Sequence, residues 1–467
     1  MRKCKERADV RPDSEKITAV FADSRKDLTR VLQFHEETGK YHQRWVKEEH
    51  MSVTSEPDGK FLFHYTPEPP TILNKPAKQA AIGLYEWMVD HGVDETVLVI
   101  GGDSTNSNTG WKGGMMTHLE ELLGRKCFWV VCLLHTTELP LRHLFSSLDG
   151  KTNSRDGWTG PIGKLVSKIN SMDRLDTFEL MSSLEPLVEL PEDILNGMST
   201  DSKVCYKLLK ALHTGKLDIS LSKVLCGPLS HSRWLTLAEA VILLHMSKHN
   251  LQGEDLRKFE LILKFVSQVY LPVWFEVKVK NKIVYGPHHI LTILRLLRQQ
   301  CPEVNEIVTP HVKSGAWFAH TEPLLLSLLA SSDKEEREFA VDKLLELRGG
   351  AELGDKSRRE RRTPNINMGA RTLRELINWE QEVIHEPIFT CDLTSQELLN
   401  IKDEPLVVPD YPLHTQSVER AVKEVTQASS AVCGSEKRDG FIKARIAHRE
   451  VMPKFISKKD MKNMFSI

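Results

Sequence analysis

A short uninterrupted run of hydrophobic residues, Val97–Ile100, is followed at once by two glycines and Asp103. Such a run, bounded by a turn, is typical of a strand buried on both faces. Gly101 and Gly102 allow the backbone to turn sharply where this strand ends. Asp103 is therefore predicted at the carboxyl end of a central strand, where open α/β sheets place the side chains that bind ligands.

Other hydrophobic runs predict further strands of the same sheet. Residues 17–23 form an apolar strand that also ends in a carboxylate, Asp23. Two less regular segments, 42–54 and 60–66, are joined by a Pro-Asp-Gly turn, in which proline presets one backbone angle and glycine supplies a positive φ. Residues 127–132 are another run of large apolar side chains, as in a buried strand.

Helical periodicity predicts the segments between these strands, at 74–92, 114–123 and 138–148. The resulting order is strand, hairpin, helix, strand, helix, strand. It fits a mixed sheet with helices on both faces, which is the topology of the ribonuclease H-like fold. In that fold the first and fourth strands are neighbours. Asp23 and Asp103 are therefore expected side by side, although they lie 80 residues apart (103 − 23).

The predicted fold class is an α/β ribonuclease H-like mixed sheet interrupted by a large all-α insertion. The chain divides into four segments, namely the first part of the core at 1–164, a helical insertion at 165–408, a C-terminal core helix at 409–435 and a basic tail at 436–467. One strand, 277–284, is predicted within the insertion. We expect the tail to be loosely ordered.

Two loops could be considered for phosphate binding. The glycine-rich stretch 150–164 ends at Lys164, but a P-loop needs glycine where Trp158 stands and serine or threonine where Leu165 stands. A surface connection is favoured there. The second loop is strongly basic, and it is either a solvated turn or a patch that contacts phosphates; its arginines are Arg358, Arg359, Arg361 and Arg362.

Composition limits the function classes further. The chain has 467 residues with 63 basic and 64 acidic side chains, so nucleic-acid contacts would have to use local patches. The eight cysteines include no Cys-x-x-Cys pair, which indicates reduced thiols and argues against a zinc finger of the usual spacing. A charged N-terminus without an apolar core does not resemble a signal peptide. With no apolar run near the ~20 residues that span a bilayer, a nuclear or cytoplasmic protein is predicted, neither secreted nor membrane-bound.

Two carboxylates at the ends of adjacent buried strands repel each other unless a cation lies between them. This is the physical reason to predict a divalent metal at Asp23 and Asp103. Carboxylate oxygens suit Mg²⁺ or Mn²⁺, and two such ions can stabilise the attacking and leaving oxygens of a phosphodiester displacement. A third carboxylate from a helix is expected, but spacing alone does not select it among the 64 acidic residues.

Four motifs, taken in order, resemble the hAT superfamily of DNA transposases. They are the stretch Asp103–Asn108, the Cys-x-x-His sequence Cys132–His135, the triplet Ser232–Trp234 and the Ser-x-x-Glu-Arg-like sequence Ser417–Arg420. Each motif alone is weak. In this order, with a long helical region between the last two, they resemble a ribonuclease H-like core with a helical insertion. The resemblance covers about residues 15–435.

The resemblance implies a catalytic triad of Asp23, Asp103 and Glu419, which would bind two Mg²⁺ or Mn²⁺ ions. Asp23 is followed by residues that differ from the family's usual continuation, so Asp27 stays open as the first carboxylate. It also implies DNA as the partner, and it leaves open whether the chain forms a homo-oligomer.

The same resemblance implies side chains that contact DNA. Cys132 and His135 would line the site, or else be a buried thiol and a structurally bonded histidine. Trp234 would stack on an unpaired base, or else be a core tryptophan. Arg233 and Arg420 would contact phosphates, or else pair with carboxylates.

Two hypotheses follow. In the first, the chain is a nuclease and strand transferase: water attacks a phosphodiester, and the freed 3′-hydroxyl attacks a second strand. In the second, a transposon-derived chain keeps the fold but only binds nucleic acid or protein. The family's BED zinc finger has no counterpart here, so the chain has lost its DNA reader or is part of a longer product. A ribonuclease H-like exonuclease is disfavoured, because the insertion before Glu419 is so long.

Overall fold

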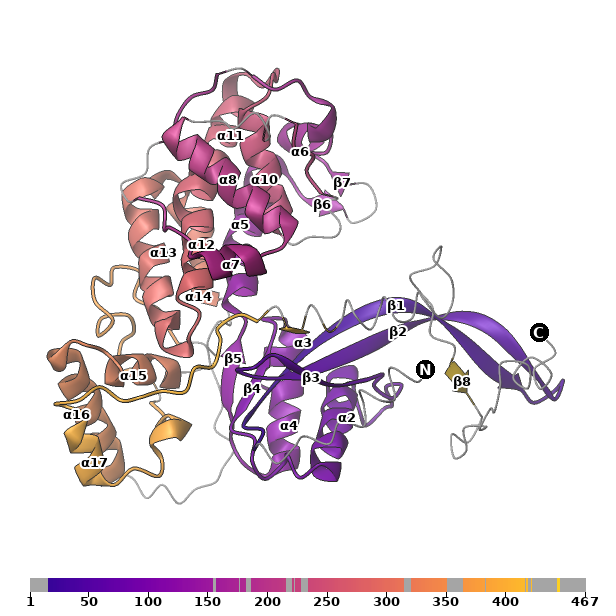
Figure 1. Ribbon diagram of the computed structural model, residues 1–467, viewed down its shortest axis with the longest axis vertical. Helices are drawn as coiled ribbons and strands as arrows, with labels where there is room; N and C mark the ends of the chain where they lie inside the picture. Colours follow the sequence, from indigo (N-terminus) through magenta and orange to yellow (C-terminus); the bar gives the residue numbers. More distant parts are fainter. Residues whose placement is uncertain are drawn as a thin grey trace. The chain divides into compact units, whose positions relative to one another are not determined.

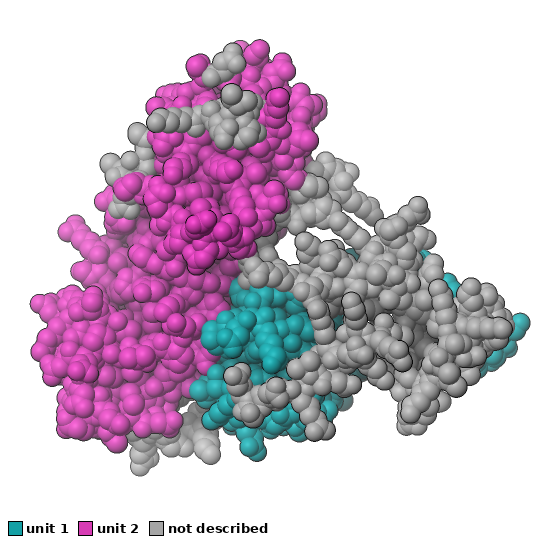
Figure 2. All heavy atoms as spheres, viewed as in Figure 1, with its two compact units in different colours: residues 1–102, 113–127, 415–467 teal, residues 103–112, 128–414 magenta. Residues whose placement is uncertain are grey.

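The computed structural model describes most of the chain between residues 16 and 421, and a short piece near the C-terminus. The described ranges are 16–153, 157–175, 177–181, 186–215, 221, 223–227, 234–314, 321–350, 364–382, 384–415, 417–418, 421 and 443–445. They divide into two units, coloured separately in Figure 2. The first unit comprises residues 1–102, 113–127 and 415–467, and the second comprises 103–112 and 128–414.

A mixed sheet has the strand order β3-β2-β1-β4-β5 (Figure 1). Its strands are β1 (Ala19–His35), β2 (Lys40–Ser55), β3 (Lys60–Tyr65), β4 (Val99–Gly102) and β5 (Phe128–Val131). β1 and β3 each pair antiparallel with β2, whereas β4 pairs parallel with β1. The predicted mixed sheet, with its first and fourth strands adjacent, is confirmed.

Close packing fixes the register between β1 and β4. Phe21 lies opposite Gly101, an offset of 80 residues (101 − 21). A Cβ atom on Gly101 would lie 2.3 Å from the Phe21 ring, so only glycine lets the ring lie against the strand. All four residues of β4 are buried, as predicted from their apolar run.

The long hairpin of β1 and β2 differs from the prediction. β1 does not end at Asp23 but continues to His35, paired with β2 over its whole length. The polar residues after Asp23 extend the ladder because the partner strand satisfies their backbone groups. β3 reaches β2 only at Met51–Ser55, so the remainder extends from the sheet as a ribbon (Figure 1). A short strand, β8 (Lys443–Arg445), pairs with β1, so this piece of the predicted loose tail is ordered.

The helices of the first unit agree with the hydrophobic periodicity. They are α2 (Pro76–Asp90) and α4 (Met115–Leu123), which pack against each other. In α2, the predicted stripe buries Ala81, Leu84 and Met88. α4 ends at Gly124, whose φ of 65° is left-handed, as helix C-termini favour.

The second unit is largely helical (Figure 1). Its elements are α3 (Asn106–Thr109), α5 (Leu133–Asp149), β6 (Thr152–Asn153), β7 (Gly157–Trp158), α6 (Pro161–Val166), α7 (Glu192–Gly197), α8 (Thr200–Thr214), α10 (Trp234–His245), α11 (Gly253–Phe265), α12 (Leu271–Val279), α13 (Gly286–Gln300), α14 (Asn305–Ser314), α15 (Glu322–Leu329), α16 (Lys334–Gly350) and α17 (Ser395–Asn400). The strand predicted at 277–284 is wrong. Its first residues end α12, whose apolar side chains are buried on several sides, so tertiary packing overrides β-propensity.

The glycine-rich loop before α6 is not a phosphate loop, as the sequence indicated. The Asp149 carboxylate accepts hydrogen bonds from the backbone N–H groups of Ile162 (2.8 Å) and Gly163 (2.7 Å). A carboxylate of the protein thus occupies the helix N-terminus where a phosphate would bind. Burial raises the pKa of Asp149, while these two hydrogen bonds oppose that rise.

The described cysteines, six in number, form no disulfide bonds, in line with the expectation of reduced thiols. No helix in the described ranges is long and apolar enough to cross a membrane.

One acid is buried in the helical core. Glu239 of α10 is 1% exposed, and its Oε2 has no hydrogen-bond partner among the described residues. Burial raises the pKa of Glu239 to about 8, and the nearby Asp201 charge adds to the rise. The ionised form of Glu239 is therefore disfavoured in the folded protein at neutral pH.

We expect Glu239→Gln to remove part of the pH dependence of stability. Between the ordinary carboxyl pKa of 4.5 and about 8, the folded protein holds a proton that the unfolded chain has released. Stability contributed by protonated Glu239 is therefore lost as pH rises through this window, by at most about 1.4 kcal/mol per pH unit. Urea unfolding across the window measures it. Glu260→Gln, on the exposed surface of α11, should retain the wild-type dependence. A wild-type-minus-Glu239→Gln difference that is flat with pH would contradict the assignment.

Candidate functional site

The Asp103 carboxylate is held by the loop that follows β4. Its Oδ1 accepts hydrogen bonds from the backbone N–H of Thr105 (3.0 Å), the Thr105 hydroxyl (2.6 Å) and Nδ2 of Asn108 (2.7 Å). Asn108 is buried in the short helix α3. Three donors on one oxygen fix the carboxylate orientation, which explains physically why an asparagine follows at this spacing.

His135, the last residue of the Cys-x-x-His motif, supports the same loop. Its Nδ1 accepts a hydrogen bond from the backbone N–H of Ser104 (3.3 Å) and also lies within hydrogen-bond distance of the Ser104 hydroxyl. An Nδ1 that accepts from an N–H group carries no proton itself, so this contact selects the imidazole tautomer. His135 therefore holds the residue next to Asp103.

Cys132, the first residue of that motif, contacts the segment that leads toward Glu419. Its Sγ lies 3.3 Å from Nδ1 of His414. The next residue, Leu133, donates its backbone N–H to the Leu413 carbonyl (3.1 Å), which satisfies one of the free donors at the start of α5. The motif thus contacts the Asp103 loop through His135 and the 413–414 segment through Cys132.

Asn281, just after α12, is a residue that the sequence reasoning missed. Its Nδ2 donates to the His414 carbonyl (2.6 Å), and its Oδ1 accepts from the His414 backbone N–H (2.8 Å). The Asn281 carbonyl accepts a third bond, from the Leu413 N–H (3.1 Å). The side-chain amide therefore pairs with the backbone of His414 as a neighbouring strand would. No sequence signal connects two residues 133 positions apart (414 − 281).

Glu56 holds the next part of this segment in the first unit. Its Oε1 accepts a hydrogen bond from the Thr415 hydroxyl (2.6 Å). Glu56 is 5% exposed, and burial raises its pKa although hydrogen bonds from Thr415 and Ser417 oppose the rise. Ser417 packs against the β2–β3 turn so closely that a Cβ on Gly59 would lie 2.1 Å from the Ser417 Oγ. Ser417, the first residue of the Ser-x-x-Glu motif, is thereby fixed two positions before Glu419.

The predicted site residues are described unequally. Asp23 is half-buried in β1, and its Oδ1 accepts the Ser24 backbone N–H (2.8 Å). Asp27 pairs with Glu48 in the ladder, and Trp234 begins α10, but the side chains of Asp27 and Trp234 lie outside the described set. Wholly outside the described residues lie Glu419, Arg420, Arg233, Arg358, Arg359, Arg361 and Arg362.

The metal site therefore stays a prediction. In the part of the chain that the structure describes, no group of three or more His, Cys, Asp or Glu side chains is arranged to hold a metal ion. The donor chemistry of Asp23 and Asp103 fits Mg²⁺ or Mn²⁺, since both offer carboxylate oxygens.

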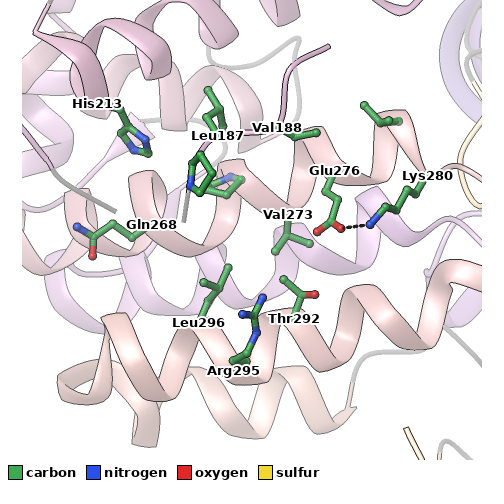
Figure 3. A pocket seen from close by; sticks show the side chains of 13 residues that line it. Leu187, Val188, His213, Gln268, Val273, Glu276, Lys280, Thr292, Arg295 and Leu296 are labelled. Atoms are coloured by element: carbon green, nitrogen blue, oxygen red, sulfur yellow. Dashed lines mark hydrogen bonds and ion pairs between the residues drawn. The ribbon is translucent and has the colours of Figure 1, made fainter. Parts of the chain in front are cut away.

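A separate cavity of about 290 Å³ lies in the second unit, between α8, α12 and α13 (Figure 3). An ion pair between Glu276 and Lys280 (3.0 Å) lies on its wall. His213, also on the wall, lies with its Nε2 3.1 Å from the Ser267 carbonyl, and burial lowers the pKa of His213. None of the predicted site residues lines this cavity, so the sequence motifs do not assign it a function.

Comparison with known proteins gives little information. No family model matches the chain, and no curated protein matches its sequence. The structure is similar to a chain of the "Drosophila P element transposase strand transfer complex", with 12% sequence identity and a TM-score of 0.24, over 73% of this chain and 80% of that one. A TM-score this low supports no argument about function, which has to come from the residues and their contacts.

We expect Asn281→Ala to loosen the segment before Glu419. The change removes two side-chain hydrogen bonds to His414 and leaves both backbone groups without a partner, which costs about 1–3 kcal/mol. Urea unfolding measures the cost, and hydrogen exchange at the His414 amide locates it. The matched control is Asn305→Ala, which removes a hydrogen bond local to α14, from Thr309. Unchanged protection of the His414 amide in Asn281→Ala would contradict the role of Asn281.

Proposed function

We propose that the chain is a transposase-like, metal-dependent nuclease and strand transferase of transposon origin, with Asp23, Asp103 and Glu419 as its triad. The observation that carries the proposal is the parallel register of β1 and β4. The offset of 80 residues between Phe21 and Gly101 is the same as that between Asp23 and Asp103 (103 − 23). Each aspartate follows its paired residue by two positions, and side chains two apart on a strand share a face.

Two carboxylates in such positions favour a bound cation, because their mutual repulsion is otherwise uncompensated. When bound, Mg²⁺ or Mn²⁺ would supply charge stabilisation for phosphodiester displacement. The protein's own part is orientation: Thr105 and Asn108 hold the Asp103 carboxylate. Glu56 and Asn281 hold the segment that leads to Glu419.

The ribonuclease H-like and hAT-type assignments are supported by topology and motif order. The strand order β3-β2-β1-β4-β5, with β4 parallel to β1, is the order expected for a ribonuclease H-like core. The hAT-like motifs gain a common physical explanation, because Cys132 and His135 contact the 413–414 segment and the Asp103 loop. DNA as the substrate comes from the motif resemblance. Cys132 and His135 are accordingly proposed as positioning residues, not as DNA contacts.

The second candidate function is nucleic-acid or protein binding without cleavage. It is favoured by the internal hydrogen bonds of Asp103: three donors satisfy its Oδ1 without any metal ion. A carboxylate bonded in this way stabilises the loop even where catalysis has been lost.

The test is cleavage of labelled duplex DNA in Mg²⁺ or Mn²⁺. Asp103→Asn and Glu419→Gln should each lower the rate roughly 10²–10³-fold, since each removes a ligand worth several kcal/mol in the transition state. Mn²⁺ titration by calorimetry should show weakened binding in both variants. Asp90→Asn, at the exposed end of α2, is the control and should retain activity. Equal inactivity of wild type and variants, with unchanged Mn²⁺ binding, would favour the non-cleaving candidate.

A further inference from the structure

The β1–β2 hairpin extends well beyond the rest of its sheet. β4 pairs only with residues 19–21 of β1, and β3 pairs only with residues 51–55 of β2. We call residues 24–50 the arm; its only other described pairing is with β8, at Val31–Gln33 (Figure 1). At about 3.4 Å per residue, the β1 side of the arm is roughly 40 Å long, close to one turn of B-DNA.

The two faces of the arm differ in chemistry. Opposed residues of an antiparallel pair share a face. The pairs His35–Lys40, Gln33–His42 and Val31–Arg44 therefore line one face, and the register continues without a shift to Asp23–Ser52. The opposite face carries Phe34 and Tyr41, with ring centroids 5.2 Å apart, together with Trp45 and Lys47.

The outer part of the first face is exposed and cationic. We call it the cationic face, made of Gln33, His35, Lys40, His42 and Arg44, all of them exposed. Arg44 Nη1 donates to the Gln33 side-chain oxygen, which holds the guanidinium against this face. Among the described side chains of this face from Gln33 to Val46 there is no carboxylate; Glu36 and Glu37 lie in the turn at the tip.

The shape and charge of the arm fit one partner better than others. A two-stranded ribbon is marginally stable by itself in water, so an exposed ribbon of this length is better stabilised with a surface to lie on. The major groove of B-DNA accepts a two-stranded β-ribbon, and Lys and Arg side chains neutralise the phosphates beside it. Asp23 belongs to the same face at the base of the arm, so a duplex along the cationic face would lead toward the proposed metal site.

We propose that the arm binds double-stranded DNA through its cationic face, next to the position where the strand is cut. The inference deepens the proposed function and rests on it for the identity of the substrate. It assigns Lys40 and Arg44 to phosphate contacts. It also assigns Gln33, His35 and His42 to positions from which they reach the groove.

The experiment measures binding of a fluorescein-labelled duplex by full-length protein, by anisotropy at several salt concentrations without divalent metal. The variant Lys40→Gln/Arg44→Gln should weaken binding. It should also flatten the plot of log affinity against log salt by about 1.8, because the variant neutralises two fewer phosphates. Lys47→Gln is the matched control, since Lys47 is exposed on the opposite face of the same strand. It should bind as wild type does and should retain the wild-type salt slope.

Two results would overturn the role of the arm. One is a double variant with wild-type affinity and slope; the other is equal weakening by Lys47→Gln. A change in oligomeric state by light scattering, without a change in DNA affinity, would make the arm a contact between copies and would also overturn the inference. Binding without cleavage in Mg²⁺ by wild type would leave the arm assigned and remove the proposed activity. Cleavage by wild type with an unaffected double variant would do the reverse.

Discussion

The parallel pairing of β4 with β1 is the interaction on which the candidate site depends. Three residue pairs, from Ala19–Val99 to Phe21–Gly101, fix the register. Gly101 permits it because the Phe21 ring occupies the space of a side chain. A slip by one residue would turn one strand's side chains to the other face and separate the chemistry of the two aspartates. The buried, side-chain-poor end of β4 is thus the price of bringing residues 80 apart (103 − 23) into corresponding positions.

The segment 413–417 is held from several parts of the chain. Asn281 pairs with the His414 backbone, Cys132 and Leu133 contact His414 and Leu413, and Glu56 binds Thr415. Each contact closes a long loop, whose entropy cost grows only slowly with length. The helical region therefore has a structural function beyond its own core: through Asn281 it fixes the chain shortly before the proposed third carboxylate.

Buried acids show how much of the structure is built from internal polar contacts. Asp149 occupies the helix N-terminus that a nucleotide phosphate would need, and Glu56 binds the hydroxyl of Thr415. Glu239 lacks such compensation, so burial raises its pKa to about 8. Carboxylates in this protein therefore serve as structural ligands as well as candidate metal ligands. Distinguishing the two roles at Asp103 requires chemistry and not geometry alone.

The hydrophobic pattern by itself determined the strands β4 and β5, the helices α2 and α4, and the adjacency of the first and fourth strands, because these elements have one unambiguous period and clear glycine boundaries. It did not determine where β1 ends or that 277–284 is not a strand. In both cases the outcome depends on a partner, the β2 ladder or the surrounding helices, that local sequence does not encode. The motifs selected Asp103, Cys132 and His135 as site residues, but only the tertiary structure revealed which groups they contact. Asn281 and Glu56 came from the structure alone, since hydrogen bonds between residues 133 and 359 positions apart leave no spacing that a sequence pattern could show.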